Sequence, residues 1–437
     1  MRFITACILY LMFTSQVIAL ETIPGPRDCF WARGPVSADP YINIAYPDAN
    51  VYYWAATFST PEGSTLEIKG DYPHSRYMSF FSYDESGRPI GSLTDYLIKS
   101  ESTNPFVPGN QRSKSYRAYT VEVVNANSLE TKTTDDELNK SITNILYTPQ
   151  YKKDQQLIVY RVYLPDKNTD PTGGVKLPQP ILTLSDGTKL ADKEACKALN
   201  ASQPLQISLD ALGIPPNDYI KLINQPGKLD TWPSHNPTKW FIQLDRKSLI
   251  GMYTGDIDPN APRSEGGFYP NLDNDYIRAI INRKHGKVLI VRGKAPTTPN
   301  TYDGKSISEE AELRYWSLCS NQSFVNTRVN DCLFDEEIPV NKNGIYTIAI
   351  SRAEDRPRNA IKECGIAWLP MADDGDGMFD EDVTIIQFRH MLPSKNFQHS
   401  IQRVMRQDQL ETVMGPYMPK ARYLMTNQVE TFFPCSS

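Results

Sequence analysis

Short runs of apolar residues, separated by turn residues, recur along the chain and predict strands. Residues 51–58 form a continuous strand-type run, and residues 65–70 alternate apolar and polar positions after a turn. Alternation with period two is typical of a half-buried strand. Several short strands at this spacing predict a mainly β protein built from sandwich or jelly-roll-like domains. The further runs lie at 77–83, 119–124, 157–163, 287–292, 313–319 and 345–350.

The order of these runs repeats along the chain. Residues 46–73 align without a gap on residues 269–296, with eight identical positions over 28. Ordinary composition supplies about one or two matches over this length. Further on, residues 76–79 (Arg-Tyr-Met-Ser) match residues 314–317 (Arg-Tyr-Trp-Ser). The chain is therefore predicted to contain two tandem, related β domains.

The N-terminal segment has the features of a secretory signal peptide. Residues 1–19 contain one early positive charge, Arg2, followed by an apolar run at 8–13 and small or branched residues at 17–19. The apolar run is too short for a membrane span, and no other segment is apolar enough to cross a bilayer. We expect a secreted or periplasmic protein that does not span a membrane.

Helical patterns fall between the two copies and near the C-terminus. Short helices are expected at 192–200 and 217–224, and Ser394 is a candidate cap for a third helix with an apolar face over 397–404. We prefer core packing as the reason for that face. The expected domains are 20–165 for the first repeat, 166–240 for a connecting segment with short helices, and 241–437 for the second repeat with its C-terminal helix.

Cysteine content agrees with export. Removing Cys7 with the signal peptide leaves six cysteines, an even number that suggests disulfides, although six buried thiols are the alternative. Cys319 ends one predicted strand and Cys332 begins the next apolar stretch, so a hairpin would bring these two together. The matching positions in the first copy are expected to be Phe81 and Tyr96. Spacing leaves open the pairing of Cys29, Cys196, Cys364 and Cys435.

Charge and composition narrow the class of partner. The net charge of −5 argues against nucleic acid, because phosphate binding needs a basic surface. The 24 tyrosines and 33 prolines favour a β-rich protein with long loops. Tyrosine-rich surfaces also bind ligands with little loss of entropy.

Two Arg–Asp combinations recur in both copies. Arg76 with Asp95, and Arg314 with Asp331, are expected to form structural ion pairs between neighbouring strands, because an unpaired buried charge is very costly. A sharper hypothesis places Asp95 opposite Asp331 as the carboxylate pair of a glycosidase. Two arginines would hold both acids ionised and leave no general acid. We therefore favour the structural interpretation.

Familiar catalytic motifs are absent from the sequence. There is no Gly-x-Ser-x-Gly elbow, His-Glu-x-x-His, phosphate loop or dinucleotide fingerprint. Among five widely separated histidines, His74 is a weak catalytic candidate because it lies two residues before Arg76. A lone histidine beside a strand is more often structural.

The acidic segment 373–382 is the candidate for a cation site. Clustered aspartates with glycines offer oxygen ligands and a tight turn, as calcium requires, but the register of an EF-hand fails. The competing interpretation, which we prefer, is a solvated hairpin tip between the runs at 368–370 and 383–386. No other cofactor is expected. The calcium candidates are Asp374, Asp376, Asp380 and Asp382.

Two motifs support a family resemblance. Residues 314–319 (Arg-Tyr-Trp-Ser-Leu-Cys), preceded by residues 291–296 (Val-Arg-Gly-Lys-Ala-Pro), resemble an uncharacterised family of exported, mostly bacterial proteins. That family is distantly similar to exported domains of unknown function with an aromatic-Trp-Ser strand. The resemblance implies export and a β-sandwich fold, and it brings no catalytic residue.

Two main classes of function remain, with a structural component of the envelope as a third possibility. The first is an exported binding or surface-interaction protein for a glycan, lipid or peptide, which uses aromatic faces or the cleft between the repeats. The second is an exported, glycosidase-like hydrolase with its site in the same cleft. Convergent carboxylates there would favour the enzyme, and aromatic side chains would favour binding. We favour binding.

Overall fold

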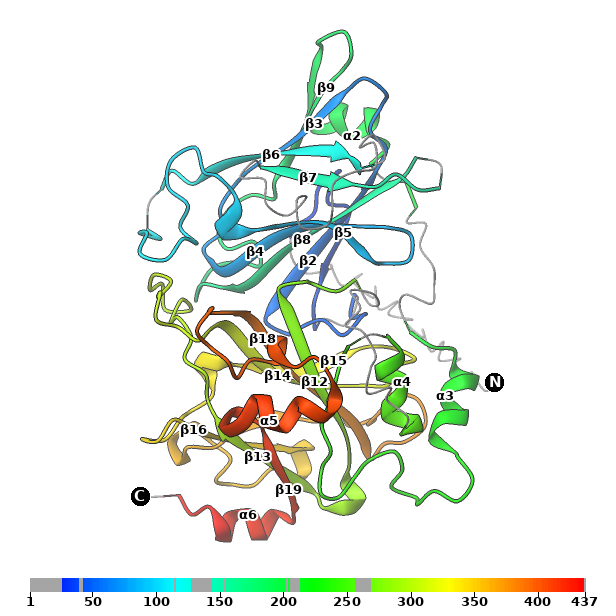
Figure 1. Cartoon of the computed structure of the whole chain (residues 1–437), viewed down its shortest axis with the longest axis vertical. Helices are drawn as coiled ribbons and strands as arrows, with labels where there is room; N and C mark the ends of the chain where they lie inside the picture. Colours follow the sequence, from blue (N-terminus) through cyan, green and yellow to red (C-terminus); the bar gives the residue numbers. More distant parts are fainter. Residues whose placement is uncertain are drawn as a thin grey trace, which may run out of the picture.

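Four β-sheets are stacked along the long axis of the molecule (Figure 1). The computed structural model describes residues 26–435 except 39–41, 114, 127–143, 153, 202, 205–212, 245 and 256–268. The predicted signal peptide lies outside the described residues. Each repeat forms a sandwich of two sheets, and one sheet of each sandwich, here called its inner sheet, faces the other repeat. The mainly β, two-repeat architecture is confirmed.

The first repeat is a sandwich of two five-stranded sheets. Its inner sheet has the order β1 (Arg33–Val36), β2 (Val51–Phe58), β8 (Gln156–Pro165), β4 (Ser75–Tyr83) and β5 (Pro89–Thr94). Its outer sheet has the order β10 (Lys189–Ala191), β9 (Gln179–Thr183), β3 (Thr65–Asp71), β6 (Ala118–Asn125) and β7 (Ile145–Thr148). Neighbouring strands are antiparallel except for the parallel pair β6 and β7.

The second repeat reproduces this topology. Its inner sheet has the order β11 (Phe241–Ile242), β12 (Asn274–Asn282), β18 (Val383–Pro393), β14 (Leu313–Asn321) and β15 (Val329–Phe334). Its outer sheet has the order β17 (Ala367–Pro370), β16 (Ile345–Ser351), β13 (Val288–Lys294) and β19 (Lys420–Leu424). Here too one pair, β16 with β17, is parallel. The duplication seen in the sequence therefore extends through both sheets.

The segment between the repeats belongs partly to the first sandwich. Within 166–240, strand β9 pairs with β3, and β10 pairs with β9. Helix α2 (Asp192–Ala198) follows directly, and α3 (Pro216–Ile223) and α4 (Arg246–Thr254) lie beside the second repeat (Figure 1). The first repeat thus extends into the segment that was expected to connect the two.

The C-terminal region differs from the expected helix. After β18 the chain turns and forms a short 3-10 helix, Ile401–Arg403, and the α-helices come later, as α5 (Leu410–Met414) and α6 (Thr426–Phe432). Phe397, Ile401 and Val404 are buried in the core of the second sandwich. Their spacing therefore reflects core packing, as we preferred, and the prediction of a helix starting after Ser394 is wrong.

Alternation along the inner strands separates two environments. Trp54 and Phe80 point into the core of the first sandwich, whereas Tyr77 and Tyr163 point toward the second repeat and pack against Tyr315. Strand β4 is buried at every position for this reason. The central inner strands β4, β8, β14 and β18 are covered on both faces, so their burial shows almost no alternation.

Three disulfides cross-link the chain. Cys319 and Cys332 are register partners on β14 and β15 and form a disulfide, as the hairpin predicted. The other two bonds join residues that are far apart in the sequence, a feature that spacing does not reveal. Three disulfides indicate an oxidising compartment. The remaining pairs are Cys29–Cys196 and Cys364–Cys435.

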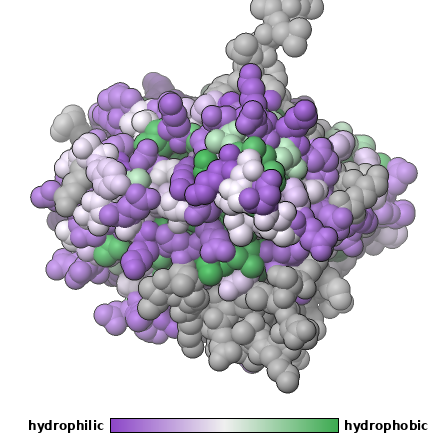
Figure 2. Space-filling view, turned by 90° about the horizontal axis from the view of Figure 1, so that it is seen from above, coloured by the Kyte–Doolittle hydropathy of each residue, from purple (hydrophilic) through white to green (hydrophobic). Residues whose placement is uncertain are grey.

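The outer surface at the end of the first repeat is largely hydrophilic, with small scattered hydrophobic groups (Figure 2). Among the described residues, no helix is both long enough and apolar enough to cross a bilayer.

Candidate functional site between the repeats

A cavity of about 450 Å³ lies where the two inner sheets face each other. Its walls combine apolar and aromatic residues from both repeats with a group of arginines. Among the described residues that line it, the hydrogen-bonding side chains belong to tyrosine, tryptophan, arginine, asparagine and glutamine. The aromatic residues are Tyr46, Tyr53, Trp54, Tyr163, Tyr269 and Tyr276, and the arginines are Arg27, Arg33, Arg161, Arg278 and Arg389.

Strand register places equivalent arginines on the two walls. Arg161 on β8 is the register partner of Tyr53, and Arg389 on β18 is the register partner of Tyr276. Because side chains alternate along a strand, both arginines point away from their own sandwich core and toward the other repeat. They occupy the same position in the two copies.

Arg389 is neutralised by a carboxylate from the other repeat. Its guanidinium pairs with Asp48 on the loop before β2, and both residues are fully or almost fully buried. The same carboxylate accepts hydrogen bonds from the Tyr315 hydroxyl at 3.0 Å and from the Ser317 hydroxyl at 2.7 Å. The positive charge of Arg389 is therefore compensated inside the protein.

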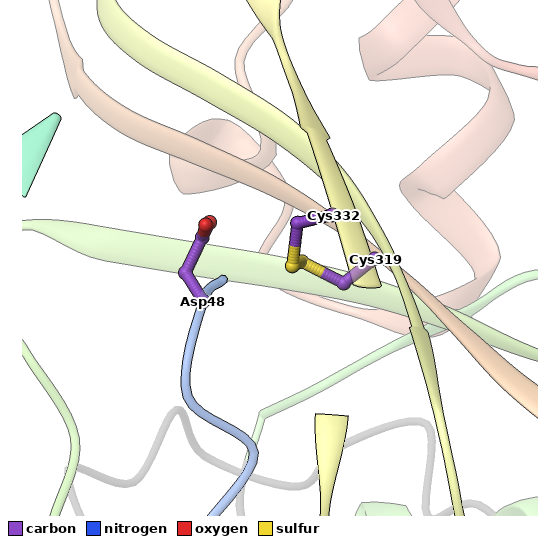
Figure 3. Close-up of side chains that lie close together, drawn as sticks. All are labelled: Asp48, Cys319 and Cys332. Carbon is purple, nitrogen blue, oxygen red and sulfur yellow. A yellow bond between two sulfur atoms is a disulfide. The ribbon is translucent and has the colours of Figure 1, made fainter. Parts of the chain in front are cut away.

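Asp48 also lies beside the Cys319–Cys332 disulfide (Figure 3). Among the described residues these three form the one cluster with metal-type ligand atoms. A cysteine binds a metal ion as its thiolate, and here the two sulfurs are bound to each other in the disulfide. The cluster therefore serves the fold, and the carboxylate serves Arg389.

Arg161 has a neutral residue where Arg389 has an acid. The alignment of the repeats places Asn271 at the position of Asp48. The Arg161 guanidinium donates to the Tyr83 hydroxyl and, at 2.9 Å, to the Tyr269 carbonyl, while its Nε and Nη1 have no partner. Nearby tyrosine hydroxyls raise its pKa further above the ordinary value, despite the opposing effect of burial.

The second repeat has a carboxylate, Asp273, two residues after Asn271, which is the position that corresponds to Asp48. Asp273 occupies the position of Asn50 in the first copy and accepts a hydrogen bond from the Tyr77 hydroxyl at 2.7 Å. Burial raises the pKa of Asp273, and contacts with Thr94, Tyr77 and the arginines Arg314 and Arg161 oppose that rise. The acid is therefore held mainly by hydroxyl groups.

Arg278, on the other wall, has no acidic partner among the described residues. It lies on β12, is 3% exposed, and has Nε and Nη1 without hydrogen-bond partners. Its guanidinium stacks over the Tyr46 ring at 4.5 Å. Burial lowers the pKa of Arg278 to about 10. The alignment places Ala55 at this position in the first repeat, so the charge belongs to one wall only.

The predicted Arg–Asp pairs connect different residues from those expected. Arg76 donates to Asp335 of the second repeat, and Arg314 donates to Asp95 of the first, so both pairs cross between the repeats. Asp95 and Asp335 each begin a short 3-10 helix at equivalent places. The pairings Arg76–Asp95 and Arg314–Asp331 are wrong for two reasons: each arginine pairs with an acid of the other repeat, and the expected match of Asp95 with Asp331 is four residues out of register with the observed match to Asp335.

The same slip explains two further misplacements. Asp331 lies on β15, half-buried, and its carboxylate accepts a hydrogen bond from the Cys332 amide at 2.8 Å. In the first repeat the register partner of Phe81 is Ser92, not Tyr96, which is exposed. Asp95 and Asp331 are not among the residues that line the cavity within the described chain. Their role as a glycosidase pair stays a prediction.

His74 lies at a loop beside β4. Its backbone amide donates to the Gly173 carbonyl at 2.9 Å. Burial lowers the pKa of its imidazole, and the neighbouring Arg117 and Arg112 lower it further. The side chain is half-buried and does not line the cavity. A catalytic role for His74 stays a prediction.

The acidic loop connects two different sheets. It runs from β17 in the outer sheet to β18 in the inner sheet, so it is not the tip of a hairpin. Asp376 is buried, and one of its oxygens accepts the amides of Met378 and Phe379, each at 2.7 Å. The other oxygen accepts from the Tyr219 hydroxyl at 3.0 Å.

The other calcium candidates have partners of their own. Asp374 accepts from Gln322 at 2.6 Å, and Asp382 accepts from Arg283 at 3.1 Å. Asp380 accepts from the Asp382 amide at 2.9 Å. Within the described residues, no three of these carboxylates come together as a cation-type cluster. Calcium binding stays a prediction.

Sequence reasoning missed the arginines of the cavity. The signal was present as a single arginine inside a mainly apolar strand, at Arg161 in β8 and Arg389 in β18. Such a residue must find a partner across the sheet face. Without the packing of the two repeats, the partner was not visible.

No protein-family model and no curated protein sequence matches the chain. Among solved structures, an uncharacterised protein from Burkholderia cenocepacia is similar at 11% identity, with a TM-score of 0.46 over 91% of this chain and 84% of that one. A protein from Vibrio parahaemolyticus is similar at 10% identity, with a TM-score of 0.38 over 86% of this chain and 90% of that one.

Proposed function

We propose that this is an exported binding protein that holds a small amphipathic ligand in the cavity between its two repeats. The observation that carries the proposal is the cavity itself, of about 450 Å³, with walls from both inner sheets. Ligand sites in proteins span roughly 300–1,000 Å³ and are mostly apolar, with a few placed polar groups. The cavity has this character.

The composition of the walls supports binding. Tyr53, Tyr163 and Tyr276 supply large rigid faces, and aromatic side chains lose little entropy when a ligand packs against them. Of a glycan, a lipid and a peptide, a short lipid or another small organic molecule suits the volume of the cavity. A folded partner needs a much larger surface.

Thermal melting against a library of small amphipathic compounds tests the proposal. A ligand that binds only the folded state at a hundred times its dissociation constant adds about 2.7 kcal/mol to the free energy of unfolding. Compounds that raise the melting temperature are then titrated by calorimetry. The proposal expects a hit whose binding is lost when the cavity is filled.

Ala55→Trp is the filling variant, because Ala55 lines the cavity on β2. Ala191→Trp, at the exposed end of β10, is the matched control. Loss of binding in Ala55→Trp, with binding retained in Ala191→Trp, supports the cavity as the site. Equal binding by both variants, or no hit across the library, overturns the proposal.

A further inference from the structure

The charges around the cavity do not balance. Arg161, Arg278 and Arg389 are each at most 3% exposed, and all three line the cavity. Two carboxylates face this group, Asp48 and Asp273. Among the described residues one buried positive charge therefore has no counterpart. Arg27 and Arg33, at the cavity margin, are also positive and add no compensation.

The surplus charge is localised at Arg278. Arg389 has its acid in Asp48, and Arg161 donates to Tyr83 and Tyr269. For Arg278, burial disfavours the charged form and the like charge of Arg389 adds to this, whereas the Tyr46 and Tyr276 hydroxyls favour it. A buried charge of this kind is costly unless something pairs with it.

Two N–H donors of Arg278 have no partner among the described residues. The guanidinium lies over the Tyr46 ring, with Cζ 4.5 Å from the ring centroid. The N–H groups of a guanidinium lie in its plane and point away from its faces. Nε and Nη1 are buried and have no partner. They lie on different edges of the guanidinium, because Nη1 is on the Cδ side and the Nε–H bond points to the Nη2 side, so each can donate one charge-assisted hydrogen bond to a carboxylate oxygen of a ligand.

We propose that Arg278 binds the carboxylate of a small amphipathic carboxylic acid, whose apolar body lies against the aromatic walls of the cavity. The inference rests on the proposed function and names the ligand class of that site. A single surplus positive charge calls for a monoanion, and a carboxylate supplies one. The apolar walls call for an alkyl or aryl body of modest size.

The test compares acids with their neutral amides. Octanoate and 3-phenylpropanoate are titrated by calorimetry into the full mature chain, alongside octanamide and 3-phenylpropanamide. A charge-assisted hydrogen-bonded pair is worth about tenfold to a hundredfold in affinity. We expect at least one acid to bind about tenfold or more tightly than its amide.

Arg278→Met removes the charge and keeps an unbranched side chain. In this variant the acid should bind no more tightly than the amide, while Arg358→Met, at an exposed arginine paired with Glu430, should keep the preference. Without ligand, Arg278→Met should melt at or above the wild-type temperature, because it relieves an unpaired charge. A large fall would show that Arg278 has a structural partner and would overturn the inference.

The remaining outcomes separate this inference from the proposed function. If acid and amide bind equally and Ala55→Trp abolishes both, the cavity is a binding site and the acid preference is wrong. If no acid binds below about 1 mM, the ligand class is wrong, and the library scan decides whether another ligand occupies the cavity. If the acid preference survives Arg278→Met, the assignment to this residue is wrong.

Discussion

The guanidinium of Arg76 in the first repeat donates to both carboxylate oxygens of Asp335 in the second, at 3.0 and 2.8 Å. The reverse contact joins Arg314 to Asp95 at 3.4 Å. Arg76 also donates to the Arg314 carbonyl at 3.1 Å, and Arg314 to the Arg76 carbonyl at 3.4 Å. Each repeat thus neutralises a buried charge of the other.

Removing one member of the cross-repeat pair should be strongly destabilising. Arg76→Met leaves Asp335 buried without its cation, and breaking a buried pair in this way costs about 3–5 kcal/mol. The double variant Arg76→Met with Asp335→Asn should recover part of that loss. Urea unfolding of the two variants measures the difference in the free energy of unfolding.

Arg358→Met is the matched control for that experiment. Arg358 pairs with Glu430, but its side chain is 89% exposed, and exposed pairs contribute at most about 1 kcal/mol. A cost for Arg76→Met as small as that of the control would contradict the role assigned to the buried pair.

Stability near neutral pH should depend on Asp95. Burial raises the pKa of Asp95 to about 7, although Arg314 and the Met78 amide act in the opposite direction. A carboxyl group with a raised folded-state pKa contributes stability at low pH, and that contribution is lost as the pH rises from about 4 through 7. The slope is at most about 1.4 kcal/mol per pH unit.

Asp95→Asn stays neutral throughout and should flatten this dependence. Melting temperatures of both proteins from pH 4 to pH 8 provide the comparison. The wild type should lose stability relative to the variant as the pH rises, and parallel profiles would count against the raised pKa. Glu337, whose pKa burial also raises to about 7, contributes with the same sign to both proteins.

Acidification should lower the free energy of unfolding through protonation of His390. The imidazole is fully buried, and burial lowers its pKa to about 3. A histidine with a lowered folded-state pKa contributes stability at neutral pH, which is lost as the pH falls from about 6.5 toward 3. His390→Gln should therefore lose less stability on acidification than the wild type, measured by urea unfolding between pH 7 and pH 4.

His399→Gln offers the control for the acid limb. His399 is partly exposed, and its Nδ1 lies 2.7 Å from the Val413 carbonyl. His399→Gln removes a histidine that is not fully buried, so it provides the comparison for His390→Gln. If His390→Gln and His399→Gln lose stability alike on acidification, burial of His390 is not the cause.

Asp376 should matter more for folding than its neighbours in the acidic loop. Its carboxylate holds the amides of Met378, Phe379 and Asp380 and the hydroxyl of Tyr219. Asp376→Ala leaves these groups unpaired and should cost about 2–4 kcal/mol. Asp374→Ala, at an exposed residue with one side-chain partner, should cost less than half as much.

The same two variants test the calcium hypothesis. If the loop is structural, the cost of Asp376→Ala in chemical denaturation should be equal in calcium and in EDTA. A cost that appears only in calcium would show that the carboxylate binds the ion, and would contradict the structural role.

The sequence predicted the parts of this fold that depend on local pattern. Period-two alternation located the strands, the internal alignment located the two repeats, and the spacing of Cys319 and Cys332 predicted their bond. The partner of Arg76 was missed for a physical reason. It lies 259 residues away across the interface between repeats, and no local pattern specifies that contact.

The cavity was beyond sequence reasoning for the same reason. Its walls come from two sheets whose facing arrangement is decided by packing of residues such as Tyr163 and Tyr315. In the sequence nothing distinguishes Arg278 from the other arginines. Its burial and the absence of an acid partner in the described chain become visible only in the folded protein. Charge balance is a property of the assembled site.

The reciprocal contacts of Arg76 and Arg314 resemble the contacts across the two-fold axis of a symmetric dimer, but here they join two repeats of one chain. In such a dimer every group on one wall of the seam recurs on the other, so a bound molecule has two equivalent directions. This chain lacks that equivalence where Arg278 corresponds to Ala55, and where Asn271 corresponds to Asp48. The two directions along the seam therefore differ chemically, so the proposed ligand, which has distinct ends, is expected to bind in one orientation.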